Sequence, residues 1–252
     1  MRRFFSPHQL AHAPEKELHN GGFTDFAEKP ARAEAMLMAI GGAEIPADQG
    51  EAPILAVHDA GYIAFLKTAP ALWAEAGRPR DVTGYVWPVV GRRPLDLKRI
   101  DALIGRYSFD ASSPLTADTW NAAYWSTQSV LAATHAVLGG EHAAFALCRP
   151  PGHHSGADYL GGYCYLNSAA IAAQAARDAI AAFDPGLLIL SFGADTWDGD
   201  PISHFTLTTE DYALLARDIA VRGWPTMIAM EGGYAIDALG ANVTSLLSGF
   251  AE

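Results

Sequence analysis

Two adjacent histidines, His153 and His154, stand in a loop between Pro150-Pro151-Gly152 and Ser155-Gly156. Imidazole exchanges a proton near neutral pH, so a restrained pair of histidines indicates general acid–base chemistry. The alternative is a surface pair without a role, which the flanking prolines and glycines disfavour. Ser155 is a weaker candidate, as a nucleophile, because no nucleophile-elbow sequence surrounds it.

Two glycine-rich segments could place further groups beside a ligand. In Gly161-Gly162-Tyr163-Cys164 the glycines allow the backbone to approach a ligand closely. In Glu231-Gly232-Gly233-Tyr234 the phenol lies on a turn from which its hydroxyl can donate to an oxyanion. The alternative for Tyr234 is a buried aromatic side chain with a packing role.

A carboxylate-rich loop runs from Gly193 to Pro201 and holds Asp195, Asp198 and Asp200. Asp195 could ligate a metal ion. Asp198 and Asp200 are residues typical of turns, which is the simpler interpretation of both.

Short apolar runs precede these loops and predict the strands that position them. The runs at 143–148, 187–192 and 225–230 lack alternating polarity, and helical segments at 168–183 and 208–221 separate them. This pattern predicts an α/β fold with a parallel sheet buried by helices on both faces. Ligands bind beyond the carboxyl ends of such strands, where the polar loops lie.

The amino-terminal half predicts helices rather than strands. Helices are expected at 29–41, 58–77 and 118–138, and a further helix follows Tyr234. Residues 81–118 show no clean period and predict a long loop with a functional or subunit-contact role.

The composition sets limits on class and partners. The 252 residues include 17 basic and 28 acidic side chains, for a net charge of −11, which disfavours nucleic acid and anionic membranes as partners. The length suits one α/β domain over 1–252. No apolar run reaches the roughly 18 residues of a membrane span. Cys148 and Cys164 are too few for a disulfide scaffold and indicate a reduced, cytoplasmic protein.

The loops taken in order resemble the histone deacetylase superfamily, and most closely the bacterial acetylpolyamine amidohydrolases. The resemblance rests on Pro-Pro-Gly-His-His, Gly-Gly-Tyr-Cys-Tyr-Leu-Asn, Gly-Ala-Asp-Thr-Trp-Asp-Gly-Asp-Pro and Glu-Gly-Gly-Tyr. Segments 15–22, 57–62 and 145–150 extend it over nearly the whole chain.

This resemblance implies an arginase-like α/β fold and zinc-dependent hydrolysis of an amide, in which zinc polarises the acetyl carbonyl and activates a water molecule. It implies that His153 and His154 handle protons, that Tyr234 stabilises the oxyanion and that Asp195 ligates zinc. It also implies a substrate-binding role for three residues: Glu17, which would favour cationic polyamines, Gly162 and Tyr163.

The sequence departs from this family at one place. The family segment Asp-x-Asp-x-His-x-Gly-Asn-Gly-Thr supplies two further zinc ligands and the partners of the paired histidines, and residues 168–192 contain nothing like it. Three protein ligands are usual for catalytic zinc, so the site is expected to be incomplete, with His204 as a candidate replacement. The sheet is expected to be shortened by the loss of internal strands.

Two functions therefore remain open. The chain is a hydrolase of small acyl amides or esters with an impaired zinc site, or it is an inactive relative that binds acylated amines or a protein partner. In either case a homo-oligomer is expected, through residues 81–118 or over the shortened sheet.

Overall fold

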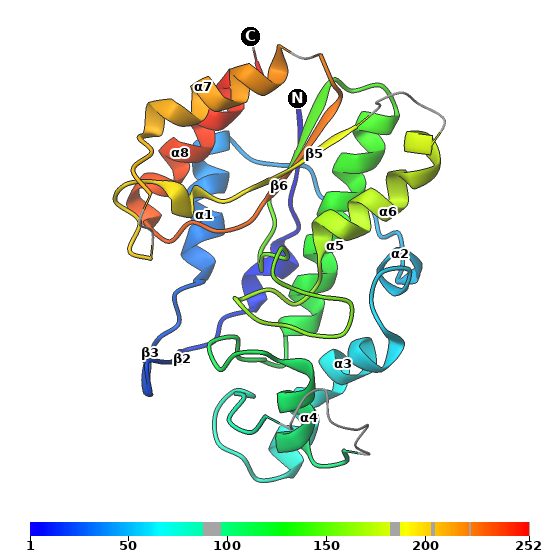
Figure 1. The fold of residues 1–252 in the computed structure, drawn as a ribbon, viewed down its shortest axis with the longest axis vertical. Coiled ribbons are helices and arrows are strands. Elements are labelled where there is room, and N and C mark those ends of the chain that lie inside the picture. The colour runs from blue at the N-terminus through cyan, green and yellow to red at the C-terminus, as the bar shows by residue number, and fades with distance from the viewer. Residues whose placement is uncertain (88–96, 182–186, 203–204, 222, 252) are drawn as a thin grey trace.

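A four-stranded parallel sheet lies at the centre of the computed structural model, which describes residues 1–87, 97–181, 187–202, 205–221 and 223–251 (Figure 1). The strands, in spatial order, are β1 (Arg2–Phe4), β4 (Ala143–Ala146), β6 (Thr226–Met230) and β5 (Leu188–Phe192). All three pairings are parallel. The predicted parallel α/β sheet is thus confirmed.

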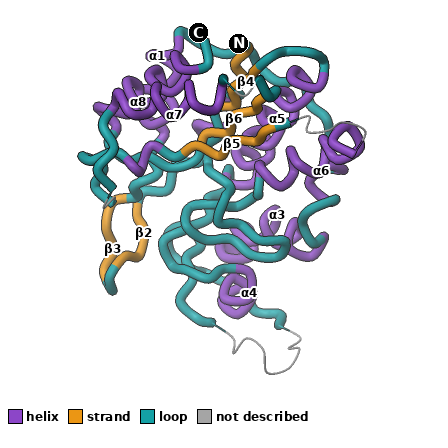
Figure 2. Tube along the Cα trace, turned by 45° about the horizontal axis from the view of Figure 1, so that its top comes forward, coloured by secondary structure: helices purple, strands orange, loops and turns teal. Residues whose placement is uncertain are grey.

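Helices cover both faces of this sheet, as Figures 1 and 2 show. On one face lie α1 (Pro30–Ile40), α7 (Thr209–Ala220) and α8 (Ile236–Gly249). On the other lie α5 (Thr119–Leu138) and α6 (Ser168–Ala181). Burial on both sides explains why the strands are apolar throughout.

The strand residues divide between the two faces with a period of two. Phe145, Ile228 and Leu190 point towards α1, α7 and α8, whereas Ala144, Ala229 and Ile189 point towards α5 and α6. The alanines let α5 lie close against β4 and β1.

A second layer of structure lies beyond the carboxyl end of the sheet. It contains α2 (Ala52–Leu55), α3 (Ala60–Glu75), α4 (Ile100–Tyr107) and a hairpin of β2 (Lys16–His19) and β3 (Gly22–Asp25), which projects from the body (Figure 2). Short 3-10 helices occupy Pro7–Ala11 and Ala194–Thr196. Among the described residues, no helix has the length and apolar character needed to cross a bilayer.

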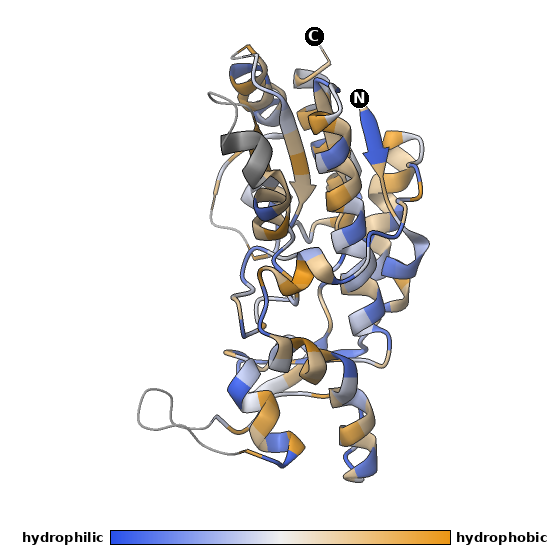
Figure 3. Ribbon diagram, turned by 90° about the vertical axis from the view of Figure 1, so that its right-hand side faces the viewer, coloured by the Kyte–Doolittle hydropathy of each residue, from blue (hydrophilic) through white to orange (hydrophobic). Residues whose placement is uncertain are grey.

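The expectation of a long loop at 81–118 needs correction. Helix α4 lies within it, and Val82, Ile104 and Leu115 are buried in the core that α3 and α5 share. The segment mixes one short amphipathic helix with turns, so no single period covers it. Residues 88–96 lie outside the described part. Figure 3 shows hydrophobic and hydrophilic residues mixed along the helices of this layer.

Most predicted helix boundaries agree with the structure to within two residues. Pro30 opens α1 and Gly41 closes it in the left-handed conformation, with φ of 73°. The Asn167 side chain accepts from the backbone N–H of Ala170 and caps α6. Asp118 precedes α5 as its N-cap residue, but its side chain makes no capping bond.

Strand β5 is an edge of the sheet. It pairs with β6 alone among the described strands, and Leu188, Ile189 and Leu190 are only partly buried. The chain enters β5 from α6 through residues 182–186, which lie outside the described part.

Candidate active site

The two histidines lie at the carboxyl end of β4, beside a buried carboxylate from the end of β6. The ring centroids of His153 and His154 are 4.0 Å apart. Glu231 lies next to His153, with 3.2 Å between its Oε2 and the His153 Nδ1. The same oxygen accepts from the backbone N–H of Gly152 at 2.7 Å, so it fixes the loop and the ring together.

The two imidazoles have opposite electrostatic surroundings. The hydrogen bond to Glu231 raises the pKa of His153. Loss of water and the neighbouring His153 lower the pKa of His154. Environments that separate two pKa values in this way assign one group as the acid and the other as the base.

The glycine loop packs directly against these rings. A Cβ atom on Gly162 would lie 2.5 Å from Cδ2 of His154, so glycine is needed for the approach. Tyr163 has a φ of 64°, which is unusual for a residue with a side chain. The Asp110 carboxylate accepts from the Gly162 N–H at 2.6 Å, and Ser113 Oγ accepts from the Tyr163 N–H at 2.8 Å. These two bonds hold the loop in its strained form.

Tyr163 connects the loop to the other two predicted site groups. Its ring centroid is 5.6 Å from that of Tyr234. Its hydroxyl donates to Glu17 Oε1 at 2.9 Å. Glu17 lies on β2, is buried, and also accepts from the backbone N–H of Ala27. The structure thus links Glu17, Tyr163 and Tyr234 by direct contacts.

Tyr234 follows β6 on a turn, and residues of two other segments, Asp200 and Arg32, contact this turn. The Asp200 carboxylate accepts from the backbone N–H groups of Tyr234 and Ala235 at 2.6 and 3.1 Å. The Arg32 guanidinium lies 4.9 Å from the centroid of the Tyr234 ring. Loss of water raises the pKa of Tyr234 well above its ordinary value, so the phenol keeps its proton and can donate.

A buried ionic cluster of Glu28, Arg32 and Arg149 contacts the backbone of the site. Glu28 Oε1 lies 2.5 Å from Arg32 Nη1 and 3.2 Å from Arg149 Nε. Arg32 also donates to the carbonyl oxygens of Glu231 and Gly233, on either side of the turn. Burial raises the pKa of Glu28, and the two guanidinium groups oppose that rise. The cluster fixes the backbone that carries Glu231 and Tyr234.

Asp195 lies at the carboxyl end of β5, with its carboxylate against Gly232. Within the described residues, no group of three or more His, Cys, Asp or Glu side chains could hold a metal ion. Among those residues Asp195 therefore lacks the two further protein ligands that a catalytic zinc usually has. The alternative ligand His204 lies outside the described residues.

Ser155 is not placed as a nucleophile. It is buried, and its hydroxyl donates to the backbone carbonyls of Tyr159 and Tyr165. Its hydroxyl is thus committed to holding the loop. Both cysteines are buried free thiols.

Several supporting residues were not predicted from the sequence. No recognisable motif surrounds Asp110, Arg32 or Glu28. Glu231 and Asp200, in contrast, belong to the glycine-rich turn and the carboxylate-rich loop that the sequence indicates. Asp110 is followed by Ala111, two serines and a proline, a turn-forming sequence that offered the one local signal.

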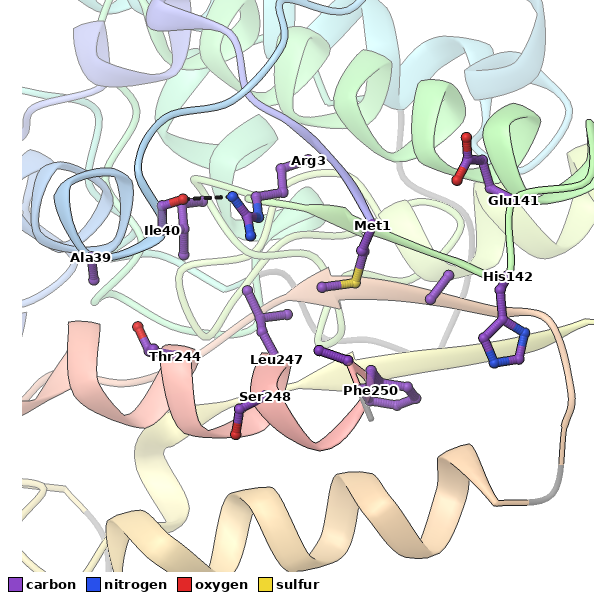
Figure 4. Close-up of a pocket in the computed structure, with 12 residues that line it drawn as sticks. Met1, Arg3, Ala39, Ile40, Glu141, His142, Thr244, Leu247, Ser248 and Phe250 are labelled. Carbon is purple, nitrogen blue, oxygen red and sulfur yellow. Dashed lines mark hydrogen bonds between the residues drawn. The ribbon is translucent and has the colours of Figure 1, made fainter.

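A separate cavity of about 470 Å³ lies at the amino ends of the strands, the opposite end of the sheet (Figure 4). Met1, Leu247 and Phe250 line it, and Arg3 there donates to the Ile40 carbonyl at 2.7 Å. None of the predicted site residues lines this cavity.

Comparisons with known proteins identify relatives that align over the whole chain. The chain is 32% identical to acetylpolyamine amidohydrolase 1 of Pseudomonas aeruginosa, over 99% of this chain and 99% of that protein. It is 31% identical to the acetylpolyamine amidohydrolase of Mycoplana ramosa, with both chains fully covered. The crystal structure of the acetylpolyamine aminohydrolase of Burkholderia pseudomallei superposes with a TM-score of 0.91 at 32% identity, covering 100% and 98% of the two chains.

The HD domain of HDA15 shares the fold alone. Its TM-score is 0.76 at 17% identity, covering 100% of this chain and 91% of that domain.

The relatives are longer than this chain. The alignment with the Mycoplana protein has 341 positions, whereas this chain has 252 residues, so at least 89 positions face gaps. The model of the histone deacetylase domain matches residues 27–181 and again 175–250, two stretches that meet within α6. This interruption coincides with the region that lacks the zinc-binding segment. The extent of the match shows that the chain belongs to the histone deacetylase family.

Proposed function

We propose that this chain hydrolyses acyl amides or esters of small amines, with His154 as general base, His153 as general acid and Tyr234 as the oxyanion donor. The observation that carries the proposal is the unequal pair of imidazoles: Glu231 forms a hydrogen bond with His153, and His153 in turn lies against His154. The names of the relatives, which are acetylpolyamine amidohydrolases, support an acylated amine as the substrate.

The chemistry follows from the protonation states. Neutral His154 accepts a proton from water, whose oxygen then bonds to the acyl carbon. The Tyr234 hydroxyl donates to the oxyanion that forms. Protonated His153 delivers its proton to the leaving nitrogen or oxygen as the bond to the acyl carbon breaks. A final proton transfer from His154 to His153 restores both rings.

We assign the binding of the substrate's amine group to Glu17 and Tyr163. Glu17 supplies a carboxylate for an ammonium group, and the hydroxyl of Tyr163 holds that carboxylate in place. The acidic net charge of −11 adds a weak long-range attraction for a cation.

No step is assigned to zinc, because the described residues do not complete a set of ligands for it. Esters have a lower barrier than amides, so they are the substrates for which proton transfer and the Tyr234 hydroxyl suffice. The same incomplete ligand set supports a second candidate function, an inactive relative that binds acylated amines or a protein partner without cleaving them.

Turnover of 4-nitrophenyl acetate and N-acetylputrescine, with zinc content measured on the same protein, separates the candidates. We expect ester cleavage without stoichiometric zinc, and a fall of at least about 100-fold in Tyr234→Phe and in His154→Ala. Unchanged rates in both variants would refute the assigned roles. Stoichiometric zinc with chelator-sensitive turnover would refute the incomplete zinc site, and no turnover of either compound would favour the binding function.

We also propose that the chain self-associates through the 81–118 segment, where Tyr85, Trp87 and Phe109 expose large aromatic surfaces. Exposed aromatic clusters of this kind are typical of protein contacts. Light scattering at micromolar concentration tests this proposal, and a monomer would contradict it.

A further inference from the structure

An apolar groove runs along the exposed edge of the sheet and ends at the candidate site. Its volume is about 760 Å³, within the range of small-molecule pockets. Leu188 and Leu190 of β5 form one wall, and Leu215 and Ile219 of α7 form the other. Trp224 stands at the amino end of β5, and His153, Asp195 and Glu231 stand at the carboxyl end.

The groove exists because β5 has no neighbour on its outer side among the described strands. The match to the family is interrupted within α6, the helix that precedes β5 in the chain. From Leu188 to Phe192 the strand spans roughly 13 Å at the usual rise per residue. That length accommodates an extended alkyl chain of medium length.

The charges at the His153 end of the groove select the chemistry of the occupant. Asp195 and Glu231 line that end and Asp218 lines the α7 side. These carboxylates repel the anion of a free fatty acid, whereas the apolar walls favour an alkyl chain. A neutral acyl group, joined to an amine or an alcohol, satisfies both conditions and places its carbonyl carbon at the His153 end.

We propose that this groove binds the acyl chain of a medium-chain N-acyl amine or ester. The proposal rests on the proposed function, since hydrolysis at His153 and His154 defines which bond of the ligand lies at the His153 end of the groove. It extends that function by naming the acyl group: a chain longer than acetyl is the preferred substrate.

Binding of N-octanoylputrescine and N-acetylputrescine, measured by calorimetry, tests the groove directly. Each methylene strengthens binding about fourfold when fully buried and about twofold when half buried. The six additional methylenes of the octanoyl group therefore predict roughly 60-fold tighter binding in a half-open groove.

Two neighbouring leucines of α7 give a matched pair of variants. Leu215 is 47% exposed and lines the groove, whereas Leu214 is 55% exposed and does not. Leu215→Asp should bind the octanoyl compound no better than the acetyl compound. Leu214→Asp should keep the wild-type difference. Because both side chains are about half exposed, we expect both variants to fold, and circular dichroism checks this.

Each remaining outcome has a defined meaning. Equal affinity for the two compounds, or equal effects of the two variants, would overturn the groove as an acyl site. A dimer that Leu215→Asp dissociates would also overturn it, and would assign the face to a second copy of the chain. Chain-length-dependent binding without hydrolysis would support the groove as an acyl site and refute the proposed function. Hydrolysis that does not depend on chain length would support the proposed function and refute the groove as an acyl site.

Discussion

The backbone N–H of Tyr234 donates to the Asp200 carboxylate at 2.6 Å, across 34 residues of sequence. Asp200 follows β5 and Tyr234 follows β6, so this bond joins the loops of two adjacent strands. Asp200 is 5% exposed and accepts two further backbone N–H groups, from Ala235 and Ile202. A residue that the sequence indicates as a turn former therefore also positions the phenol.

Asp200→Ala should destabilise the protein by about 2–3 kcal/mol, because three backbone N–H groups, all in partly buried hydrogen bonds, lose a charged acceptor. Asp198→Ala is the control: Asp198 is exposed in the same loop, and the expected change is within about 0.5 kcal/mol. Urea unfolding measures both. Equal stability of the two variants would show that Asp200 is only a turn residue.

The sequence predicted those parts of the site that local pattern determines. Strands such as 226–230 are short apolar runs, and each is followed by glycines that mark a loop. The loops meet because parallel strands end at one edge. The pattern of strands and loops therefore predicts that His153, Asp195 and Tyr234 lie at the same edge of the sheet.

The rest could not be predicted because long-range contacts decide it. Arg32 on α1 reaches the Glu231 and Gly233 carbonyls some 200 residues away, a pairing with no local signature. Strand β1 reads Arg-Arg-Phe, which lacks an apolar run, and it forms only because β4 lies beside it. Helix α4 was missed because eight residues are too few to show a clear period within a segment rich in turns.

The pair of His153 and Glu231 predicts a pH-dependent contribution to stability. The pKa of His153 is raised in the folded state, so its stabilisation is complete below the unfolded pKa near 6.5 and is lost as the pH rises through the folded value. Glu231→Gln removes the charge. We compare the free energy of unfolding of the wild type with that of the variant. The wild type should be the more stable, and we expect its advantage to be larger at about pH 6 than at about pH 9, by about 0.5–1 kcal/mol.

The expected difference in stability is small because water reaches about a third of the His153 side chain. Urea unfolding at both pH values measures it, and the same substitution in a His153→Ala background is the control. If the pH dependence persists without His153, another group causes it and the assignment of the acid fails.

Gly162→Ala should displace His154. The new Cβ would lie 2.5 Å from Cδ2 of that ring, and Gly162 has a φ of 56°. Gly21→Ala is a matched control, since its φ is 80° and nothing lies within 4 Å of its Cβ. Both variants should lose about 1 kcal/mol from backbone strain, but only Gly162→Ala should shift the NMR signals of His154.

Ester turnover provides a second readout for the same pair. Displacement of the base by about 1 Å costs on the order of 100-fold in rate. Gly21→Ala should keep the wild-type rate. If both alanine variants turn over ester equally well, close contact between the glycine loop and His154 is not required for the reaction.

Glu28→Gln should be among the most destabilising single changes in the chain, by about 3–5 kcal/mol, because it leaves Arg32 and Arg149 charged and buried without a counterion. Glu51→Gln breaks the ion pair to Lys67, whose side chain is 34% exposed, and should cost at most about 1 kcal/mol. Urea unfolding compares the two. Since Arg32 also holds the carbonyls beside Tyr234, Glu28→Gln should speed amide exchange in the turn at residues 231–235, whereas Glu51→Gln should not. A similar cost for both substitutions would mean that the buried cluster does not anchor the turn.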